Sequence, residues 1–208
     1  EKEKYQEEYD KMYAECKRTL YSAGYHIYTS IDPDVQKQLQ SSVDNALSGY
    51  TEKDKNGIYK TQASGTCIDN DTGKVVAIVG GREQKNIGYT LNRAFQSPRQ
   101  PGSAIKPLLV YAPALEHGWS AGSTVNDSPM STKDKNRVRN SHGSYSGQIS
   151  LRRAVQKSSN VATMRIYEQL TPKTCLKYLE EMNFKYLTDS DYKYYTTCIG
   201  GFTKGTTS

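Results

Sequence analysis

The segment PGSAIKPLLVYAPALEHG, residues 101–118, constrains the fold of this chain most, because a proline lies inside its apolar helical pattern. Pro107 has no backbone N–H, so a helix tolerates it only in the first turn, where donors have no intrahelical partner. The helix must therefore begin close to Ser103, and Gly118 is typical of its C-terminal end. On such a helix Ser103 and Lys106 lie one turn apart on the same face, close enough for the amine to reach the hydroxyl.

This S-x-x-K pair has the composition of a nucleophile with its base. A serine hydroxyl needs an adjacent base to remove its proton, and a lysine amine serves only when it is neutral. Burial and the positive end of a helix dipole would both lower the pKa of Lys106, and the backbone N–H of Ser103 could stabilise an oxyanion. The alternative is a serine near an N-cap beside a solvated lysine. A second match, Ser190 to Lys193, lies in a polar tract without a helical face and is interpreted as chance.

A second polar cluster, Ser158-Ser159-Asn160, is the only S-x-N in the chain. It interrupts the apolar helical pattern of residues 150–170, which predicts two helices separated by a short break. A break presents side chains to a cleft, where a hydroxyl can pass a proton and a carboxamide can hold a substrate amide. The alternative is that Ser158 only caps the following helix.

The rest of the chain predicts helices and strands in mixed order. The expected elements are an amphipathic helix through residues 5–20, a strand at 24–31, a helix at 32–47 with Asp32 as N-cap and Pro33 at its first position, a hairpin of 62–69 and 74–81, a loop at 123–148, and a helix at 172–184. Because regular βαβ alternation is lacking, we expect an α+β arrangement rather than a parallel sheet.

Composition excludes several functional classes. The 208 residues, 35% of them hydrophobic, suffice for one main domain plus a leader. The net charge is +6, but no Lys/Arg block is interleaved with aromatic residues, so nucleic acid is not an expected partner. No apolar stretch approaches membrane-spanning length. The widely spaced cysteines predict buried free thiols rather than a zinc site; they are Cys16, Cys67, Cys175 and Cys198.

With their flanking segments, the two polar clusters resemble the penicillin-binding proteins, in particular the transpeptidase domain of the bifunctional class A group. That family carries an S-x-x-K, S-D-N and K-T-G motif set. The resemblance covers most of the chain from about Tyr25 onward and rests on four stretches, residues 28–40, 92–118, 147–170 and 198–208.

The resemblance implies a fold like that of serine β-lactamases, an antiparallel sheet packed with helices. It also implies a bacterial cell-wall D,D-transpeptidase at the extracytoplasmic face of the membrane, which binds the D-Ala-D-Ala end of a peptidoglycan stem peptide and is acylated by β-lactams. Ser103 would be the acylated nucleophile, Lys106 its base, Ser158 a proton relay and Asn160 a ligand for the acyl-chain amide. No cofactor and no metal are implied.

One family motif is missing, because the chain contains no K-T-G. The segment TKGTTS at residues 203–208 has similar letters in another order, so Lys204, Gly205 and Thr206 are not assigned to catalysis. We expect the remainder of the same polypeptide to supply the K-T-G strand, and this chain alone to form a penicillin adduct slowly or not at all. We also expect residues 1–24 to be a linker helix from a glycosyltransferase domain with a membrane anchor, and residues 25–208 to be a partial transpeptidase domain, incomplete at its C-terminus.

Three other functions fit the same motifs. A serine β-lactamase would need a second general base for deacylation, and no residue here can be assigned to that role. A β-lactam sensor is a binding module that keeps the acylable serine. A non-catalytic scaffold of a cell-wall assembly would keep its function after Ser103→Ala.

Overall fold

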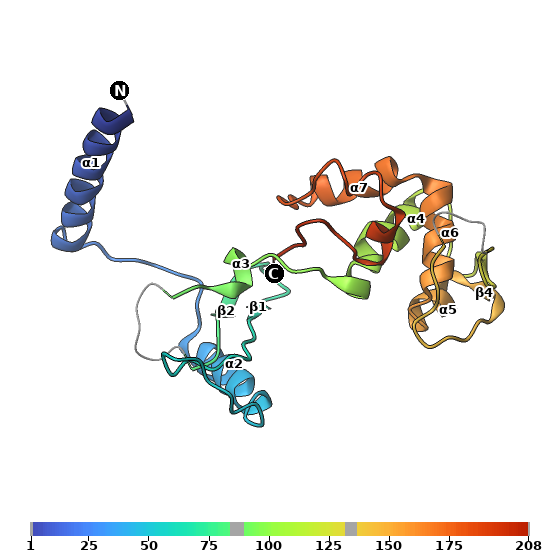
Figure 1. The fold of residues 1–208 in the computed structure, drawn as a ribbon, viewed down its shortest axis with the longest axis horizontal. Coiled ribbons are helices and arrows are strands. Elements are labelled where there is room, and N and C mark those ends of the chain that lie inside the picture. Colours follow the sequence, from blue (N-terminus) through green and yellow to red (C-terminus); the bar gives the residue numbers. More distant parts are fainter. Residues whose placement is uncertain (1, 84–89, 132–136, 208) are drawn as a thin grey trace.

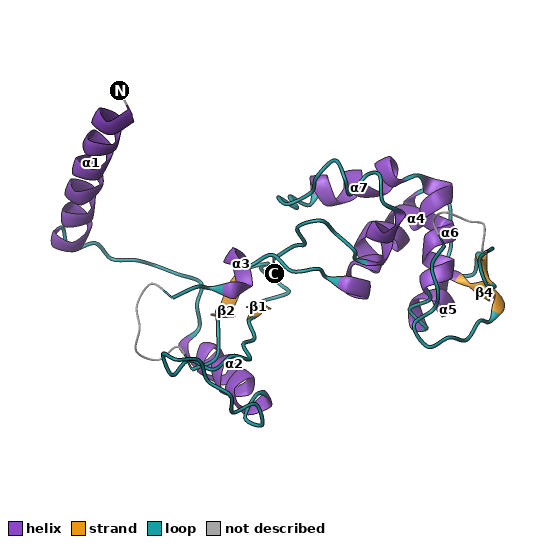
Figure 2. Ribbon diagram, in the orientation of Figure 1, coloured by secondary structure: helices purple, strands orange, loops and turns teal. Residues whose placement is uncertain are grey.

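The computed structural model describes residues 2–83, 90–131 and 137–207. Figures 1 and 2 show a mixed fold in which two short antiparallel strand pairs pack with helices. The helices are α1 (Lys2–Ser22), α2 (Pro33–Ala46), α3 (Arg93–Gln96), α4 (Ala112–Glu116), α5 (Leu151–Gln156), α6 (Asn160–Leu170) and α7 (Pro172–Glu181). The strands are β1 (Gly65–Ile68), β2 (Val75–Val79), β3 (Thr124–Asp127) and β4 (Gly147–Ser150).

Helix α2 and the β1–β2 hairpin form the first lobe. Asp32 caps α2 as predicted, because its Oδ1 accepts from Asp34 N at 2.9 Å and Val35 N at 3.1 Å. The predicted hairpin is also present, with Gly65 opposite Val79 at one end. Gln36 of α2 bonds both backbone groups of Ile78, so the helix covers the edge of β2 that β1 leaves open.

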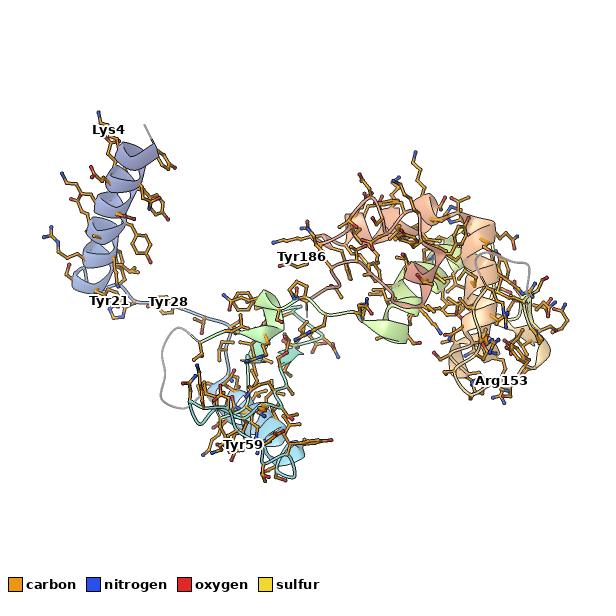
Figure 3. The ribbon with its side chains drawn as sticks, in the orientation of Figure 1. Lys4, Tyr21, Tyr28, Tyr59, Arg153 and Tyr186 are labelled. Atoms are coloured by element: carbon orange, nitrogen blue, oxygen red, sulfur yellow. The ribbon has the colours of Figure 1, made fainter. Side chains whose placement is uncertain are left out.

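The predicted strand at residues 24–31 is wrong, because this segment has no strand pairing in the structure. Ile27 and Tyr28 are 80% and 92% exposed, and Figure 3 shows Tyr28 on the stretch that leads from α1 to the first lobe. Only the end of the segment approaches β2, where Ser30 Oγ donates to Val75 O. Asp32, the next residue after the segment, donates from its N to Val76 O at 2.9 Å. Alternating apolar residues form a strand only when a partner edge and a buried face are available, and the described part of the chain offers this segment neither.

The second lobe, which includes α4 to α7, β3 and β4, contains the main hydrophobic core, with α6 at its centre. Six of the eleven residues of α6 are buried, and the helix packs against α7, β3 and the 3₁₀ helix Tyr195–Ile199. The predicted loop at 123–148 is wrong in part, because its two ends form β3 and β4, with Val125 paired to Ile149. Each of these strands contributes a single buried apolar side chain, too little for a recognisable alternation; residues 132–136 of the loop lie outside the described ranges.

The segment after Ser103 is helical as predicted, but it is not one α-helix. It begins as the 3₁₀ turn Gly102–Ile105, continues as the π-helical turn Pro107–Tyr111 and ends as α4. Lys106 N donates to Ser103 O, whereas Ala112 N donates to Pro107 O. Gly118 follows α4 with a φ of 88°, the left-handed conformation expected after a helix end.

The cysteine prediction holds for two of four residues. Cys175 and Cys198 are buried thiols, whereas Cys67 is half-buried and Cys16 is exposed on α1, which stands apart in Figure 1. Within the described ranges, no group of three or more His, Cys, Asp or Glu side chains is placed to hold a metal ion. None of the described helices combines the length and apolar character needed to cross a membrane.

Candidate active site

Lys106 is the centre of the site that the sequence predicts. Its side chain is buried, with 1% of the residue exposed, and its Nζ donates three hydrogen bonds. The acceptors are Ser158 O at 2.8 Å, Ser158 Oγ at 3.2 Å and Asn160 Oδ1 at 2.7 Å. The fold therefore joins the S-x-x-K and S-x-N segments through one amine, across more than fifty residues of sequence.

The break between α5 and α6 turns Ser158 toward this amine. Ser158 has a φ of 48°, a left-handed conformation that costs a residue other than glycine about 1–3 kcal/mol. Ser158 N bonds back to Val155 O at 2.9 Å. The N-cap of α6 is Ser159, whose Oγ accepts from Ala162 N at 3.0 Å, so the alternative in which Ser158 caps the helix is wrong. The hydroxyl of Ser158 faces Lys106 instead.

Ser103 lies on the 3₁₀ turn that precedes Lys106, and its residue is exposed. A 3₁₀ helix has three residues per turn, so positions i and i+3 project on the same side. The backbone of Gly200 packs directly against the backbone of Gly102, the residue before Ser103. The approach is so close that a Cβ on Gly200 would lie 2.2 Å from Gly102 O. The site thus places the exposed Ser103 on a turn that packs against Gly200, three residues before the buried Lys106.

Burial lowers the pKa of Lys106 from its ordinary 10.5 to about 8. A negative charge on Cys198 would raise this pKa, but burial raises the pKa of the Cys198 thiol itself, so the thiol is neutral near pH 7. The protonated amine can donate all three of its hydrogen bonds. Once deprotonated, it has a lone pair, and the Ser158 hydroxyl can reverse its bond and donate to it. Protons can therefore pass between the amine and the Ser158 hydroxyl.

Asn160 holds its carboxamide between two partners. Its Oδ1 accepts from Lys106, and its Nδ2 donates to Arg139 O at 2.8 Å. The half-buried carboxamide has two N–H groups, so one of them is available to a ligand.

The sequence missed three buried polar residues behind this site, namely Asp127, Asn140 and Ser159. They form a hydrogen-bonded cluster beneath the start of α6. Two of them fall in the segment predicted to be loop, and Ser159 is the middle residue of the S-x-N pattern, to which the pattern assigns no role. A single Asp and a single Asn in a polar stretch have no periodicity or spacing that could have identified them.

The two segments that are not assigned to catalysis, residues 190–193 and 203–208, make structural contacts of their own. Lys193 of the second S-x-x-K is exposed, and its N bonds to Ser190 O in a turn. In the T-K-G segment, Thr206 pairs with Arg99 through two backbone bonds of 2.8 Å. Gly205 is needed for this pairing, because a Cβ there would lie 2.3 Å from the Arg99 carbonyl carbon.

Comparison with known proteins gives a consistent result. Residues 63–199 match the family model described as penicillin binding protein transpeptidase domain. The chain is 38% identical over 191 residues to penicillin-binding protein 1A of Clostridium perfringens strain 13, covering 85% of this chain and 27% of that protein. It is 32% identical over 190 residues to penicillin-binding protein 4 of Bacillus subtilis, covering 91% of this chain and 28% of that protein. It therefore spans about a quarter of the length of these relatives.

Among solved structures, PonA1 from Mycobacterium tuberculosis in complex with penicillin V superimposes with a TM-score of 0.71. The two chains are 22% identical, and the match covers 89% of this chain and 49% of PonA1. At this identity the likeness concerns the fold, which agrees with the expected arrangement of antiparallel strands and helices.

Proposed function

The chain belongs to the penicillin-binding protein transpeptidase family, and from this premise we propose that it carries the nucleophile and proton-transfer groups of a bacterial cell-wall D,D-transpeptidase. The observation that supports this most is the position of Lys106. Its buried amine binds Ser158 and Asn160 and lies one 3₁₀ turn after the exposed Ser103. A buried lysine with a lowered pKa, bonded to one serine hydroxyl and one helical turn after a second serine, is suited to acyl transfer.

In the proposed first step, Ser103 Oγ attacks the carbonyl carbon of the penultimate D-Ala of a stem peptide. The neutral amine of Lys106 takes the hydroxyl proton, so a C–O bond forms as the oxygen loses its hydrogen. When the C–N bond breaks, the proton passes from Lys106 through the Ser158 hydroxyl to the departing D-Ala amine. An acceptor amine then attacks the acyl-serine in the reverse sense and restores Ser103.

Asn160 is proposed to position the acyl chain. Its Oδ1 is occupied by Lys106, and one of its amide hydrogens is occupied by Arg139 O. The second amide hydrogen can donate to a substrate carbonyl without disturbing the amine. A β-lactam would enter by the same route, with its ring amide in place of the D-Ala-D-Ala bond.

The whole protein is proposed to be larger than this chain, because the relatives are about four times as long as the segment it matches. Residues 1–24 would then be the linker helix and residues 25–208 part of the transpeptidase domain. A glycosyltransferase domain, a membrane anchor that holds the protein at the extracytoplasmic face, and the K-T-G strand would belong to the remaining polypeptide.

The test is acylation of the complete polypeptide by a fluorescent penicillin, measured by gel fluorescence and by intact mass. Ser103→Ala should abolish the adduct, whereas Ser190→Ala, in the other S-x-x-K of the same chain, should leave labelling at the wild-type rate. Labelling that survives Ser103→Ala, or an adduct on a peptide that lacks residue 103, would overturn the proposal.

A second assay separates transpeptidation from the related activities. With a D-Ala-D-Ala pentapeptide donor and an amine acceptor, a transpeptidase releases D-Ala and forms the cross-linked peptide. A β-lactamase would instead turn over many equivalents of a chromogenic cephalosporin. A sensor would be acylated once and release no D-Ala from the donor.

A further inference from the structure

Asp127, at the end of β3, is a buried carboxylate behind the S-x-N turn, with 1% of the residue exposed. It accepts hydrogen bonds from Ser159 Oγ at 2.6 Å, from Asn140 Nδ2 at 2.8 Å and from Ser146 N at 3.0 Å. All three donors are neutral groups. Because a buried carboxylate must be satisfied by donors, these contacts bind the strand end, the loop and the turn into one unit.

The carboxylate also helps to fix which way the Asn140 side chain faces. Asn140 turns its NH₂ group toward two acceptors, Asp127 Oδ1 at 2.8 Å and Ser144 O at 3.0 Å, and therefore its Oδ1 toward α6. That Oδ1 accepts from Asn160 N at 2.9 Å and from Val161 N at 3.2 Å, two donors that the first turn of a helix cannot satisfy internally. The single hydroxyl proton of Ser159 goes to the anion at 2.6 Å rather than to Asn140 Oδ1 at 3.2 Å.

The same loop segment fixes Asn160 at two points. Asn140 Oδ1 holds its backbone N–H, and the neighbouring Arg139 O holds its side-chain Nδ2. With both of these groups engaged, the carboxamide oxygen of Asn160 is left facing Lys106. A chain of contacts therefore runs from Asp127 through Asn140 and Asn160 to the amine.

We propose that Asp127 is a positioning residue, which orients the Asn140 carboxamide and thereby holds Ser158 and Asn160 against Lys106. Its predicted effect on acylation rests on the proposed function; its effect on the amine does not. If the chain of contacts loosens, the ammonium form of Lys106 loses an acceptor, so its pKa falls further. Cys198 is the titratable group that acts on Lys106 from the neighbouring 3₁₀ helix, and its buried thiol is unchanged by the substitution.

The first experiment replaces the carboxylate by its isostere, Asp127→Asn, in the complete polypeptide. A carboxamide cannot accept from all three donors, so Asn140 loses the anionic partner of its NH₂ group, keeps only Ser144 O on that side and is held less firmly. The maximal rate of acylation by a fluorescent penicillin should fall about tenfold to a hundredfold, the range for a lost hydrogen bond to a charged group. The midpoint of its pH dependence should also move to lower pH.

The swapped pair Asp127→Asn with Asn140→Asp provides the rescue. The carboxamide at position 127 can donate to the carboxylate at position 140, which in turn accepts from Asn160 N and Val161 N as the native Oδ1 does. The pair loses one bond, since a carboxylate has no N–H for Ser144 O. The pair should acylate within about tenfold of wild type and faster than either single variant. If Asp127→Asn alone does not fold, the swapped pair still decides, since its failure to fold or to acylate overturns the proposal.

The matched control is Asp191→Asn. Asp191 is equally buried, and its two oxygens accept four bonds from Thr188 and Thr203 outside the S-x-N turn. Its substitution should lower the Tm without moving the pH midpoint. An equal change in midpoint for both variants would reduce Asp127 to a structural residue and overturn the proposal.

A readout independent of acylation is the reactivity of Lys106 toward trace acetic anhydride as a function of pH, followed by peptide mass spectrometry. The Lys106 amine should titrate near pH 8 in wild type and at lower pH in Asp127→Asn. An unchanged titration in a folded variant overturns this inference, even where Ser103 is acylated. Conversely, labelling that persists in Ser103→Ala overturns the proposed function and leaves this titration intact as a test.

Discussion

Acylation of Ser103 should rise about tenfold per pH unit below pH 8 and become constant above it, because the base must be neutral to act. The pKa of Lys106 is about 8, since burial disfavours the ammonium form. At pH 7 about one tenth of the amine is then neutral, against about three in ten thousand for a lysine at 10.5. Burial of this one side chain therefore increases the supply of base about 300-fold at neutral pH.

The measurement is the second-order rate constant for acylation of the complete polypeptide by a fluorescent penicillin between pH 6 and 9.5, at constant ionic strength. The penicillin carboxylate is ionised throughout, so the protein alone determines the profile. Lys204→Met is the matched control, because Lys204 is an exposed lysine of the T-K-G segment. It should retain both the plateau and the midpoint, whereas Lys106→Met should lose the rising limb.

Two results would refute the reasoning. A rate that keeps rising toward pH 10.5 would mean that the lysine is solvated and that its burial does not tune the base. A flat profile, or one that persists in Lys106→Met, would mean that another group accepts the proton from Ser103.

Two further substitutions test the framework of the site by chemical denaturation. Gly200→Ala should lower the free energy of unfolding by about 3 kcal/mol, because its Cβ would lie 2.2 Å from Gly102 O. The control is Gly118→Ala, at a similar φ but with no atom within 4 Å, which should lower it by about 1 kcal/mol. Equal losses of stability in the two variants would contradict the close approach of Gly200 to Gly102. Ser159→Ala should lower the free energy of unfolding by about 2–4 kcal/mol, since it removes a helix cap and a donor to a buried carboxylate. The control is Ser150→Ala, which removes a cap on α5 without such a bond and should lower it by about 1 kcal/mol. A difference between the two variants below about 0.5 kcal/mol would contradict a stabilising role for the Asp127, Asn140 and Ser159 cluster.

The elements that could be predicted from sequence are those whose chemistry is local. Asp32 and Pro33 specify the start of α2 within two residues. Residues 70–73, N-D-T-G, join the two predicted strands and can take positive φ, so they specify the β1–β2 hairpin. The strand at 24–31 failed because strand formation depends on a partner edge, which a local alternation cannot reveal. The β3–β4 pair was missed for the opposite reason, since pairing between distant segments forms it with little local pattern.

The candidate site likewise has one part that local sequence predicts and another part that only tertiary folding forms. Ser103 and Lys106 are three residues apart, so their relation follows from one helical turn. The contact between Lys106 and the S-x-N turn requires tertiary folding, and only the family resemblance connected them beforehand. No local sequence pattern identifies Asp127 or Asn140, because their role depends on which donors the folded loop brings to a buried carboxylate.

The proline that predicts a helix start near Ser103 also determines the geometry of that turn. In an α-helix the N–H of residue 107 would bond to Ser103 O, but Pro107 has no N–H, and Ser103 O accepts from Lys106 N instead. That i to i+3 bond is the 3₁₀ pattern, in which positions 103 and 106 are eclipsed rather than offset around the axis as in an α-helix. By interrupting the apolar helical pattern, Pro107 thus brings the backbone positions of the exposed Ser103 and the buried Lys106 to the same side of the turn.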